Sequence, residues 1–489
     1  MEKPFACENQ TKSGFSENVL VFLYVISTPL VGAPFLFPDA VKYLLVSNNA
    51  YYWLEDEARL KTMNSLCSLG STSFLLSGVL GSYFINYINN RNTSLLATCF
   101  HILGWLFCFS LDKYCYYFPF IGMCLWGISI QLLSQTKFSV SVFYDSRKHL
   151  VLAMIGGSVG MSFAYMQLIV NIVDYFSRTG FTFPYFDITV TQFVVFINCL
   201  MPLMCIFVFY FIIPTQPFLT PVTDYCNRVS LSRSQVSATF PNLNSEERNS
   251  LVNSRLAIEV NRCKEDVPFK WTLTFKEQVF SVTFIGFTIV YSLLWFVRLY
   301  FTVNMKSILL NQTNGDIEYT DKIINIFGLS LGTTYIAAII VGMFVDMMGI
   351  YLFLILLVLS SLLILLIFSS FTPFFFLSHL FGIVLCVFCY SYFIGCSFSF
   401  LTTEFGYTYL NLTQGISSTV AGLFTILYNY WDSYIHSHYK QNFLFPSITA
   451  IVINIIILLI SVYIRIYSMR WNSFNSNYFF FVNKRYTVN

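Results

Sequence analysis

The chain has 489 residues and a formal net charge of +3, and it is 56% hydrophobic and only 10% charged. About a quarter of the residues of a soluble domain are charged, so this composition excludes an ordinary water-facing surface. It indicates an integral membrane protein with several spanning segments. The small net charge gives no reason to expect a nucleic-acid partner.

Apolar runs of about 20 residues, the length that crosses a bilayer as a helix, recur along the whole chain. In the first half they are expected at 18–46, 63–87, 94–111, 117–143, 150–176 and 188–213. In the second half they are expected at 279–303, 324–345, 349–370, 374–401, 410–431 and 446–467. The predicted fold class is therefore an all-α membrane protein with twelve transmembrane helices.

One long polar stretch, 214–277, separates the two sets of helices. Six helices, a linker and six more helices is the layout of the major facilitator superfamily, in which two six-helix bundles rock around a central site. We therefore expect the domain organisation to be an N-terminal six-helix bundle at 1–213, a cytoplasmic linker at 214–277, a C-terminal six-helix bundle at 278–470 and a cytoplasmic tail at 471–489.

Most of the 27 lysines and arginines fall on the side of the membrane that would hold both termini and the linker. Because positively charged loops tend to stay inside the cell, both termini are expected to be cytoplasmic. We expect a multi-pass protein of the plasma membrane rather than of an organelle. Its expected state is a monomer, and its expected partners are the lipid bilayer and a small-molecule substrate.

A short motif follows the eighth predicted helix, where the chain reads Gly342-Met-Phe-Val-Asp346-Met-Met-Gly349. It resembles the G-x-x-x-D-x-x-G loop signature of the major facilitator superfamily. The glycines permit a tight turn, and Asp346 could accept hydrogen bonds from the N-terminus of a neighbouring helix. The motif is thus interpreted as a conformational latch rather than a catalytic acid. The equivalent place in the first half has Asn86 instead of the acid.

Two helix junctions carry a further repeated pattern, with Asp145 before the fifth predicted helix and Glu404 before the eleventh. The stretches around them read FYDSRKHLVLAMIGGSVGMSFAYMQLIVNIVDYF and FLTTEFGYTYLNLTQGISSTVAGLFTILYNYW. Together with VGAPFLFPDAVKYLL in the first helix, they resemble the system-L facilitator amino acid transporters and their relatives, the apicomplexan amino acid transporter family. The resemblance implies an amino acid carrier, and both acids are assigned to the latch.

The first predicted helix contains Gly32, Pro34 and Pro38, which would interrupt its hydrogen bonding at membrane depth. Interrupted helices often form substrate sites in transporters, because their free backbone groups can bind the solute. Backbone near Gly32 and Pro34 could therefore meet the amino and carboxylate groups of an amino acid. The alternative is a packing kink that contacts no ligand.

Arg298 lies within the seventh predicted helix, with Tyr291 two turns before it. A charge inside a span costs at least about 2.5–3.5 kcal/mol, so it usually faces a cavity or a partner. A guanidinium can hold a carboxylate with two hydrogen bonds. The alternative is that Arg298, toward the predicted outer end, extends to the lipid headgroups. For Lys137, nearer the inner end of the fourth helix, extension to the headgroups is the favoured interpretation.

Polar side chains in other predicted spans are further candidates for substrate binding. Amides and hydroxyls suit an uncharged or zwitterionic solute, although each could instead hydrogen-bond between helices. These candidates are Gln131, Gln135, Gln167, Asn171, Tyr390 and Ser391.

No Asp or Glu falls in the middle third of a predicted helix, which favours facilitated diffusion over proton coupling. The sequence has no ATP-binding motif, no Ser/His/Asp grouping and no complete set of metal ligands, so no enzyme activity, metal or other cofactor is expected. The predicted function is a uniporter that moves neutral, aromatic or cationic amino acids by alternating access. The alternatives are a carrier of a sugar, nucleoside or organic anion, and a membrane sensor that does not transport.

Overall fold

The computed structural model describes residues 17–32, 38–110, 115–138, 140–141, 144, 147–179, 190–213, 273–369, 376–439 and 443–486, and in these ranges the regular structure is entirely helical. Some sequence-based predictions fall at least partly outside them. Pro34 and Asp145 are not described, and the linker is described only from residue 273.

The helices before the linker match the first six predicted spans. The first span is divided into α1 (Glu17–Leu30) and α2 (Pro38–Ser47), as the glycine and prolines between them predict. Asn89 has a φ of +71°, so α4 changes direction there and contains the end of the second span and the whole of the third. The others are α3 (Asp56–Leu76), α4 (Gly78–Phe109), α5 (Phe118–Phe138), α6 (Lys148–Thr179) and α7 (Val190–Ile212).

The helices after the linker match the remaining six predicted spans. The eighth span consists of α12 (Ile317–Ser330), the 3-10 turn η6 (Leu331–Thr333) and α13 (Thr334–Met348). The short α10 (Phe275–Val279) precedes the seventh span. The others are α11 (Val282–Gln312), α14 (Ile350–Phe368), α15 (Phe376–Phe405), α16 (Leu410–Tyr439) and α17 (Leu444–Tyr486).

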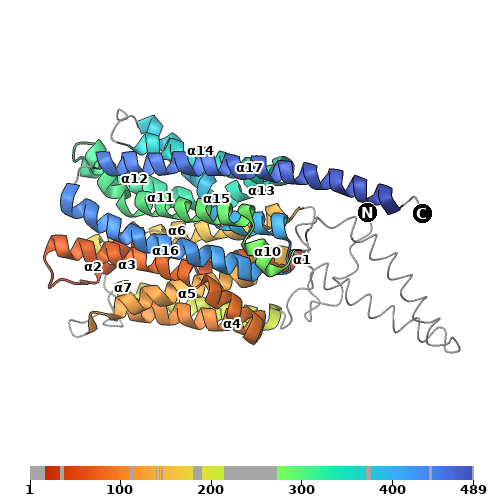
Figure 1. The fold of residues 1–489 in the computed structure, drawn as a ribbon. Coiled ribbons are helices and arrows are strands. Elements are labelled where there is room, and N and C mark those ends of the chain that lie inside the picture. Colours follow the sequence, from red (N-terminus) through yellow and green to blue (C-terminus); the bar gives the residue numbers. More distant parts are fainter. Residues whose placement is uncertain are drawn as a thin grey trace.

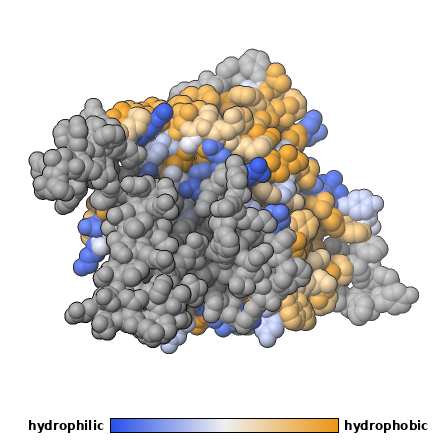
Figure 2. All heavy atoms as spheres, turned by 90° about the vertical axis from the view of Figure 1, so that its right-hand side faces the viewer, coloured by the Kyte–Doolittle hydropathy of each residue, from blue (hydrophilic) through white to orange (hydrophobic). Residues whose placement is uncertain are grey.

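Nine helical stretches among the described residues are individually long and apolar enough to cross a membrane. The number is below twelve because α1 and α2 are each short, and α3 and α16 are comparatively polar. Large apolar side chains are exposed on the sides of the helices, for example Phe207 and Leu377. Figure 2 looks onto one end of the molecule and shows hydrophobic side chains covering much of the visible flank.

The seventh and eighth spans are longer than predicted. Helix α11 continues past 303 to Gln312, and α12 begins at Ile317 instead of near 324. Asn304, just past the predicted end of the seventh span, is buried and donates hydrogen bonds to Asp432 and to the Tyr428 hydroxyl. A polar residue with buried partners can stay inside a spanning helix.

Helix α10 begins just before the predicted end of the linker. The Glu277 carboxylate accepts hydrogen bonds from the backbone N–H and the hydroxyl of Thr274, both at 2.8 Å. These bonds hold the pKa of Glu277 below its ordinary value, because they stabilise the charged form. The pair therefore fixes the point where the chain enters the second set of helices.

Contacts between the helices before and after the linker rest on small residues. Helix α6 packs against α13 and α15, while α16 lies along α3 and α4 (Figure 1). A Cβ atom added to Gly157 would collide with Ala338, and one added to Gly156 would lie 3.0 Å from the backbone nitrogen of Gly395. Glycine lets the backbones approach closely, which is how helices associate tightly in lipid.

We expect Gly342→Val to separate α13 from α6. A Cβ atom at Gly342 would lie 2.6 Å from the Cα atom of Leu150 and 3.0 Å from the Cβ atom of Ala153, and the backbone cannot move aside cheaply. Overpacking of this kind costs about 1–3 kcal/mol, so the unfolding midpoint in detergent should fall by several degrees. The control is Met343→Val on the exposed side of the same helix, and an equal midpoint for both variants would contradict the contact.

Candidate functional site

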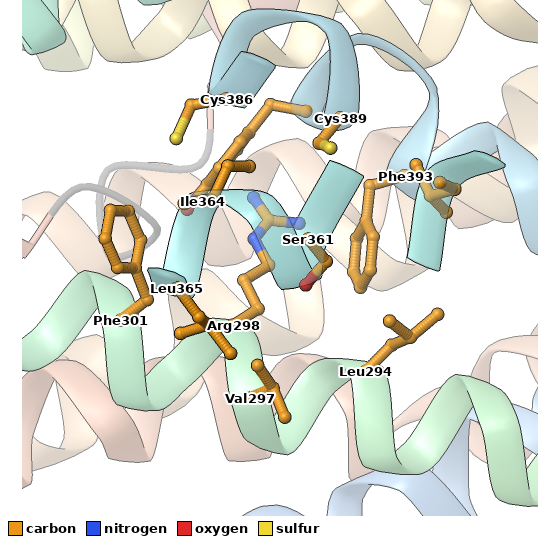
Figure 3. Close-up of a pocket in the computed structure, with 12 residues that line it drawn as sticks. Leu294, Val297, Arg298, Phe301, Ser361, Ile364, Leu365, Cys386, Cys389 and Phe393 are labelled. Atoms are coloured by element: carbon orange, nitrogen blue, oxygen red, sulfur yellow. The ribbon is translucent and has the colours of Figure 1, made fainter. Parts of the chain in front are cut away.

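Arg298 lies near the middle of α11 rather than toward an end. Because α11 continues to Gln312, the guanidinium is several turns from either end of the helix. The alternative interpretation, that Arg298 extends to the headgroups, assumed a position near the end of the helix. The length of α11 contradicts that assumption. Figure 3 shows the side chain pointing away from α11 and between α14 and α15.

Three aromatic rings surround the guanidinium of Arg298. Its central carbon lies 4.1 Å from the ring centroid of Tyr390, 4.6 Å from Phe393 and 4.9 Å from Trp295. Ring faces attract a cation, by up to about 2 kcal/mol where water is excluded. The rings hold the charge in place without neutralising it.

Two polar groups of this aromatic cage have no hydrogen-bond partner. Both the Nη1 atom of Arg298 and the hydroxyl of Tyr390 are buried without a hydrogen-bond partner. None of the ion pairs among the described residues involves Arg298. A buried donor without an acceptor is costly, so the arrangement is suited to a ligand that brings an acceptor.

The cage borders a cavity of about 50 Å³ between α11, α14 and α15. The wall consists of apolar side chains, the thiols of Cys386 and Cys389, and the Ser361 hydroxyl (Figure 3). All three helices follow the linker, so the cavity lies within one bundle. The described residues include no group of three His, Cys, Asp or Glu side chains that could hold a metal ion.

The cage also touches the other bundle through two of its rings. The Trp295 ring lies 5.7 Å from that of Phe74 in α3, and the Tyr390 ring lies 6.2 Å from that of Phe163 in α6. A relative movement of the bundles would therefore disturb the rings that hold Arg298.

Two other predicted substrate residues lie near the cage. Tyr291 is buried, and its ring lies 6.1 Å from Phe393 and 6.3 Å from Trp295. Ser391 is also buried, but its hydroxyl donates to the Phe388 carbonyl oxygen of its own helix. Tyr291 thus supports the cage, whereas the Ser391 hydroxyl forms a hydrogen bond that is internal to α15.

The predicted amides of α6 form a separate cluster. The amide groups of Gln167 and Asn171 both donate to the side-chain oxygen of Asn325 in α12, at 3.1 Å and 3.3 Å. This cluster joins the two bundles and does not reach the Arg298 cage. The alternative interpretation, hydrogen bonding between helices, describes what these two side chains do in this conformation.

The predicted amides of α5 lie elsewhere again. Gln135 donates to the Gly78 carbonyl oxygen at 2.9 Å, and its own side-chain oxygen is buried without a partner. The Gln131 amide nitrogen is likewise buried without a partner. Gly32 borders two small cavities at the end of α1. The structure therefore distributes the predicted substrate residues over several places.

The prediction that Lys137 extends to the headgroups is wrong. The side chain is 2% exposed, and its ammonium donates to the Thr28 hydroxyl of α1 at 2.9 Å. It also lies 5.3 Å from the ring centroid of Phe209 in α7. The packing of α1 and α7 against α5 covers this end of the helix, and sequence alone could not show that cover.

Asp346 accepts hydrogen bonds from a neighbouring helix N-terminus. Its two carboxylate oxygens accept from the backbone N–H groups of His149 and Leu150, each at 3.3 Å. These residues open α6, so the contact joins α13 to the other bundle. A carboxylate is favourable there because the first N–H groups of a helix lack partners and carry partial positive charge.

Two glycines of the motif act in different ways. Gly349 has a φ of +82°, which side chains rarely adopt, and it joins α13 directly to α14. Gly342 provides the close approach to Leu150 described above. Glu404 is buried at the end of α15 near Tyr351, within its own bundle. Asp145 lies outside the described residues, so the latch role of these acids stays a prediction.

Sequence reasoning missed two buried polar groupings between helices. His149 contacts the hydroxyls of Ser399, Tyr392 and Thr403 in α15, beside the Asp346 contact. Asp432 accepts hydrogen bonds from Asn304 in α11. The only sequence signal was a polar residue in an apolar run, which does not say where its partner lies.

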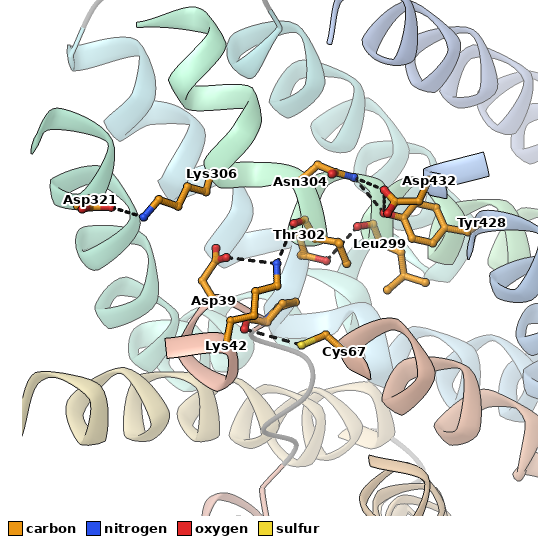
Figure 4. Close-up of polar contacts among 12 residues, drawn as sticks. Asp39, Lys42, Cys67, Leu299, Thr302, Asn304, Lys306, Asp321, Tyr428 and Asp432 are labelled. Carbon is orange, nitrogen blue, oxygen red and sulfur yellow. Dashed lines mark hydrogen bonds and ion pairs between the residues drawn. The ribbon is translucent and has the colours of Figure 1, made fainter. Parts of the chain in front are cut away.

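At the opposite end of the molecule, α2 meets α11 (Figure 4). The Lys42 ammonium donates to the Val303 carbonyl oxygen at 3.3 Å and lies 3.7 Å from an Asp39 oxygen. Lys306 pairs with Asp321 at 2.8 Å nearby. Polar contacts therefore join the bundles at both ends in this conformation.

No protein-family model and no curated protein matches the sequence. Solved structures do match. The proton:xylose symporter XylE of the major facilitator superfamily aligns with a TM-score of 0.60 and 13% identity, over 92% of this chain and 96% of that chain. A POT family transporter in complex with 5-aminolevulinic acid aligns with a TM-score of 0.60 and 15% identity, over 94% and 99%. A partially occluded inward-open form of XylE from E. coli aligns with a TM-score of 0.54 and 13% identity, over 91% and 98%.

The chain is thus a polytopic helical membrane protein built from two six-helix bundles. Its fold is that of the major facilitator superfamily, which confirms the fold class predicted from the spacing of the apolar runs. Sequence identity to these structures is low, so the comparison supports the fold alone. The solute has to be inferred from the residues of the site.

We expect Asp346→Ala to weaken the contact between α13 and α6. Hydrogen bonds to a charged group are worth about 1.5–3 kcal/mol, so the unfolding midpoint in detergent should fall by a few degrees. The matched control is Glu318→Ala, an exposed acid in the first turn of α12. If both variants unfold at the wild-type temperature, the contact adds nothing to the stability of this conformation.

Proposed function

We propose that the chain is a membrane transporter that moves amino acids, neutral or aromatic ones foremost, by alternating access. The fold supports the transport cycle, because two bundles of this kind rock around a site between or within them. The resemblance of the segments around Gly32, Asp145 and Glu404 to amino acid facilitators supports the solute. The proposed setting is the plasma membrane, with both termini cytoplasmic and the protein a monomer.

The observation that carries the proposal is the unneutralised guanidinium of Arg298. It lies in mid-helix, lines a cavity, and has an orphan hydroxyl of Tyr390 beside it. A carboxylate entering the cavity would accept two hydrogen bonds from the guanidinium. The rings of Phe393 and Trp295 would then favour an aromatic or aliphatic side chain over a strongly hydrated one.

Alternating access requires the two bundles to separate at one end at a time. The contacts between the bundles at the two ends include hydrogen bonds: Asp346 with the N-terminus of α6, and Lys42 with the Val303 carbonyl oxygen. Each can exchange its protein partner for water when its end opens. The small-residue contacts of α6 in between allow the rocking movement, because no large side chains interlock there.

A carrier of another small organic solute is the second candidate, and the same cation favours an organic anion over a sugar. One of the similar structures holds 5-aminolevulinic acid, an amino-substituted acid, whereas XylE is a xylose symporter. A sugar has no charge to neutralise Arg298. A sensor that does not transport is the third candidate, and the unequal motifs of the two halves are its only support.

Facilitated diffusion is the proposed mode, since the buried acids of the second bundle lie away from mid-helix. Asp432 and Glu404 are buried, but each lies in the last third of its helix. Lys137 is a further buried ionisable side chain.

Uptake of labelled amino acids in oocytes tests the proposal directly. We expect saturable uptake of neutral or aromatic amino acids, inhibited by analogues that keep the carboxylate and not by the corresponding amides. Arg298→Met should lower kcat/KM about 10- to 100-fold, because a charge-assisted hydrogen-bond pair is lost. Surface expression should be measured in parallel.

The matched control is Arg178→Met, whose side chain is exposed and pairs with Asp174 at 2.9 Å. It removes the same charge from the surface of the protein and should transport normally. Unimpaired uptake by Arg298→Met would remove Arg298 from the site. Absence of flux for every amino acid at normal surface expression would overturn the proposed solute.

A further inference from the structure

Lys137 places a second buried cation in the bundle that does not contain Arg298. It lies near the end of α5 and is 2% exposed. Its surroundings come from three helices: Thr28 of α1, Phe209 and Cys205 of α7, and the neighbouring turn of α5 itself. No carboxylate is paired with it in the part of the chain that the structure describes.

The hydrogen bonding of Lys137 is incomplete. An ammonium has three N–H donors, and the Thr28 hydroxyl accepts one of them at 2.9 Å. The Thr28 hydroxyl donates its own proton to the Tyr24 carbonyl oxygen at 2.6 Å, so it acts toward Lys137 only as an acceptor. The ring of Phe209, 5.3 Å away, offers a weak contact. Two donors therefore remain for another acceptor.

A small cavity adjoins the ammonium. It has a volume of about 10 Å³ and lies between α1, α5 and α6. Besides Lys137, its polar lining consists of Thr28, Ser134 and the backbone at Gly32, and the remaining lining is aliphatic or aromatic, including Ile155 and Phe138. The cavity thus combines one cation, two hydroxyls and an apolar wall.

We propose that this cavity binds a small monovalent anion, held by the ammonium of Lys137. The ligand would carry a compact negative charge that accepts hydrogen bonds from the two free N–H groups. A free inorganic anion such as chloride and a carboxylate both have this chemistry. An intramembrane ionisable side chain without a partner is costly, and an anion relieves that cost. Lysine suits such a ligand because its charge is compact and its stem is flexible.

The position of the cavity gives the bound anion a structural consequence. It would lie where α1 ends, beside Gly32, and would contact α1, α5 and α6 together. Helix α6 carries the small-residue contacts to the other bundle. Anion binding would therefore stabilise the closed packing of the first bundle, independently of what Arg298 binds in the second.

Thermal unfolding of the purified full-length chain in detergent tests this site without requiring transport. Sodium chloride and sodium acetate are each titrated against sodium gluconate, a bulky anion, at constant sodium concentration. Because a ligand of the folded state raises the unfolding midpoint, we expect an upward shift of at least about 2 °C at saturation with one of the two anions. A shift with chloride, alone or with acetate, identifies a free anion, and one with acetate alone identifies a carboxylate.

The shift should vanish in Lys137→Met and persist in Lys137→Arg, which keeps the charge. The control is Lys322→Met, which removes an exposed lysine and should shift as the wild type does. Should Lys137→Met not fold, Lys137→Gln replaces it. The proposal is overturned if neither anion shifts the wild type, or if the shift survives loss of the charge. Because amino acid uptake is not involved, the proposed function and this site can fail separately.

Discussion

The close approach of α6 to α13 and α15 is the contact on which the rest of the structure depends. It needs residues without large side chains, and Gly157, Gly342 and Gly395 lie where a Cβ atom would meet the neighbouring helix. Lipid offers helices no hydrophobic reason to associate, so packing and a few hydrogen bonds must hold the bundles together. Because the backbones touch, Asp346 reaches the N-terminus of α6 and the Tyr390 ring reaches Phe163. The contact of Asp346 with α6 and the candidate site around Arg298 therefore both depend on the same packing of α6 against α13 and α15.

Burial of charge is the second theme of the molecule. Arg298 and Lys137 lie in different bundles, each beside a cavity, and neither is paired with an acid among the described residues. The two cations have different surroundings. Arg298 is surrounded by ring faces that stabilise a cation, and its Nη1 atom has no hydrogen-bond partner, whereas Lys137 has one hydroxyl and one distant ring. A membrane protein tolerates such groups where they serve a solute or an ion, since an unused charge would only destabilise it.

Sequence reasoning succeeded where a local pattern has a local cause. The run of apolar segments predicted the position of each spanning helix, and the Gly-Pro stretch predicted the break between α1 and α2. It failed where the outcome depends on a distant partner. The sequence did not indicate that Asn304 is buried against Asp432, and it favoured the headgroups for Lys137, which Thr28 of α1 and Phe209 of α7 cover. Neither partner is near in sequence, so no spacing rule could have found it.

The sequence by itself determined that the chain spans a membrane with two sets of six helices, because hydrocarbon accepts only long apolar helices whose backbone bonds are internal. It also determined the kinds of residue available for a site: one arginine and one lysine within apolar runs, and scattered amides. Tertiary packing alone decided which of these meet. It places Tyr390, Phe393 and Trp295 around Arg298, whereas Gln167 forms a hydrogen bond with Asn325. The reason is geometric: helical periodicity gives the direction of a side chain on its own helix, but only the crossing of two helices gives that side chain a neighbour.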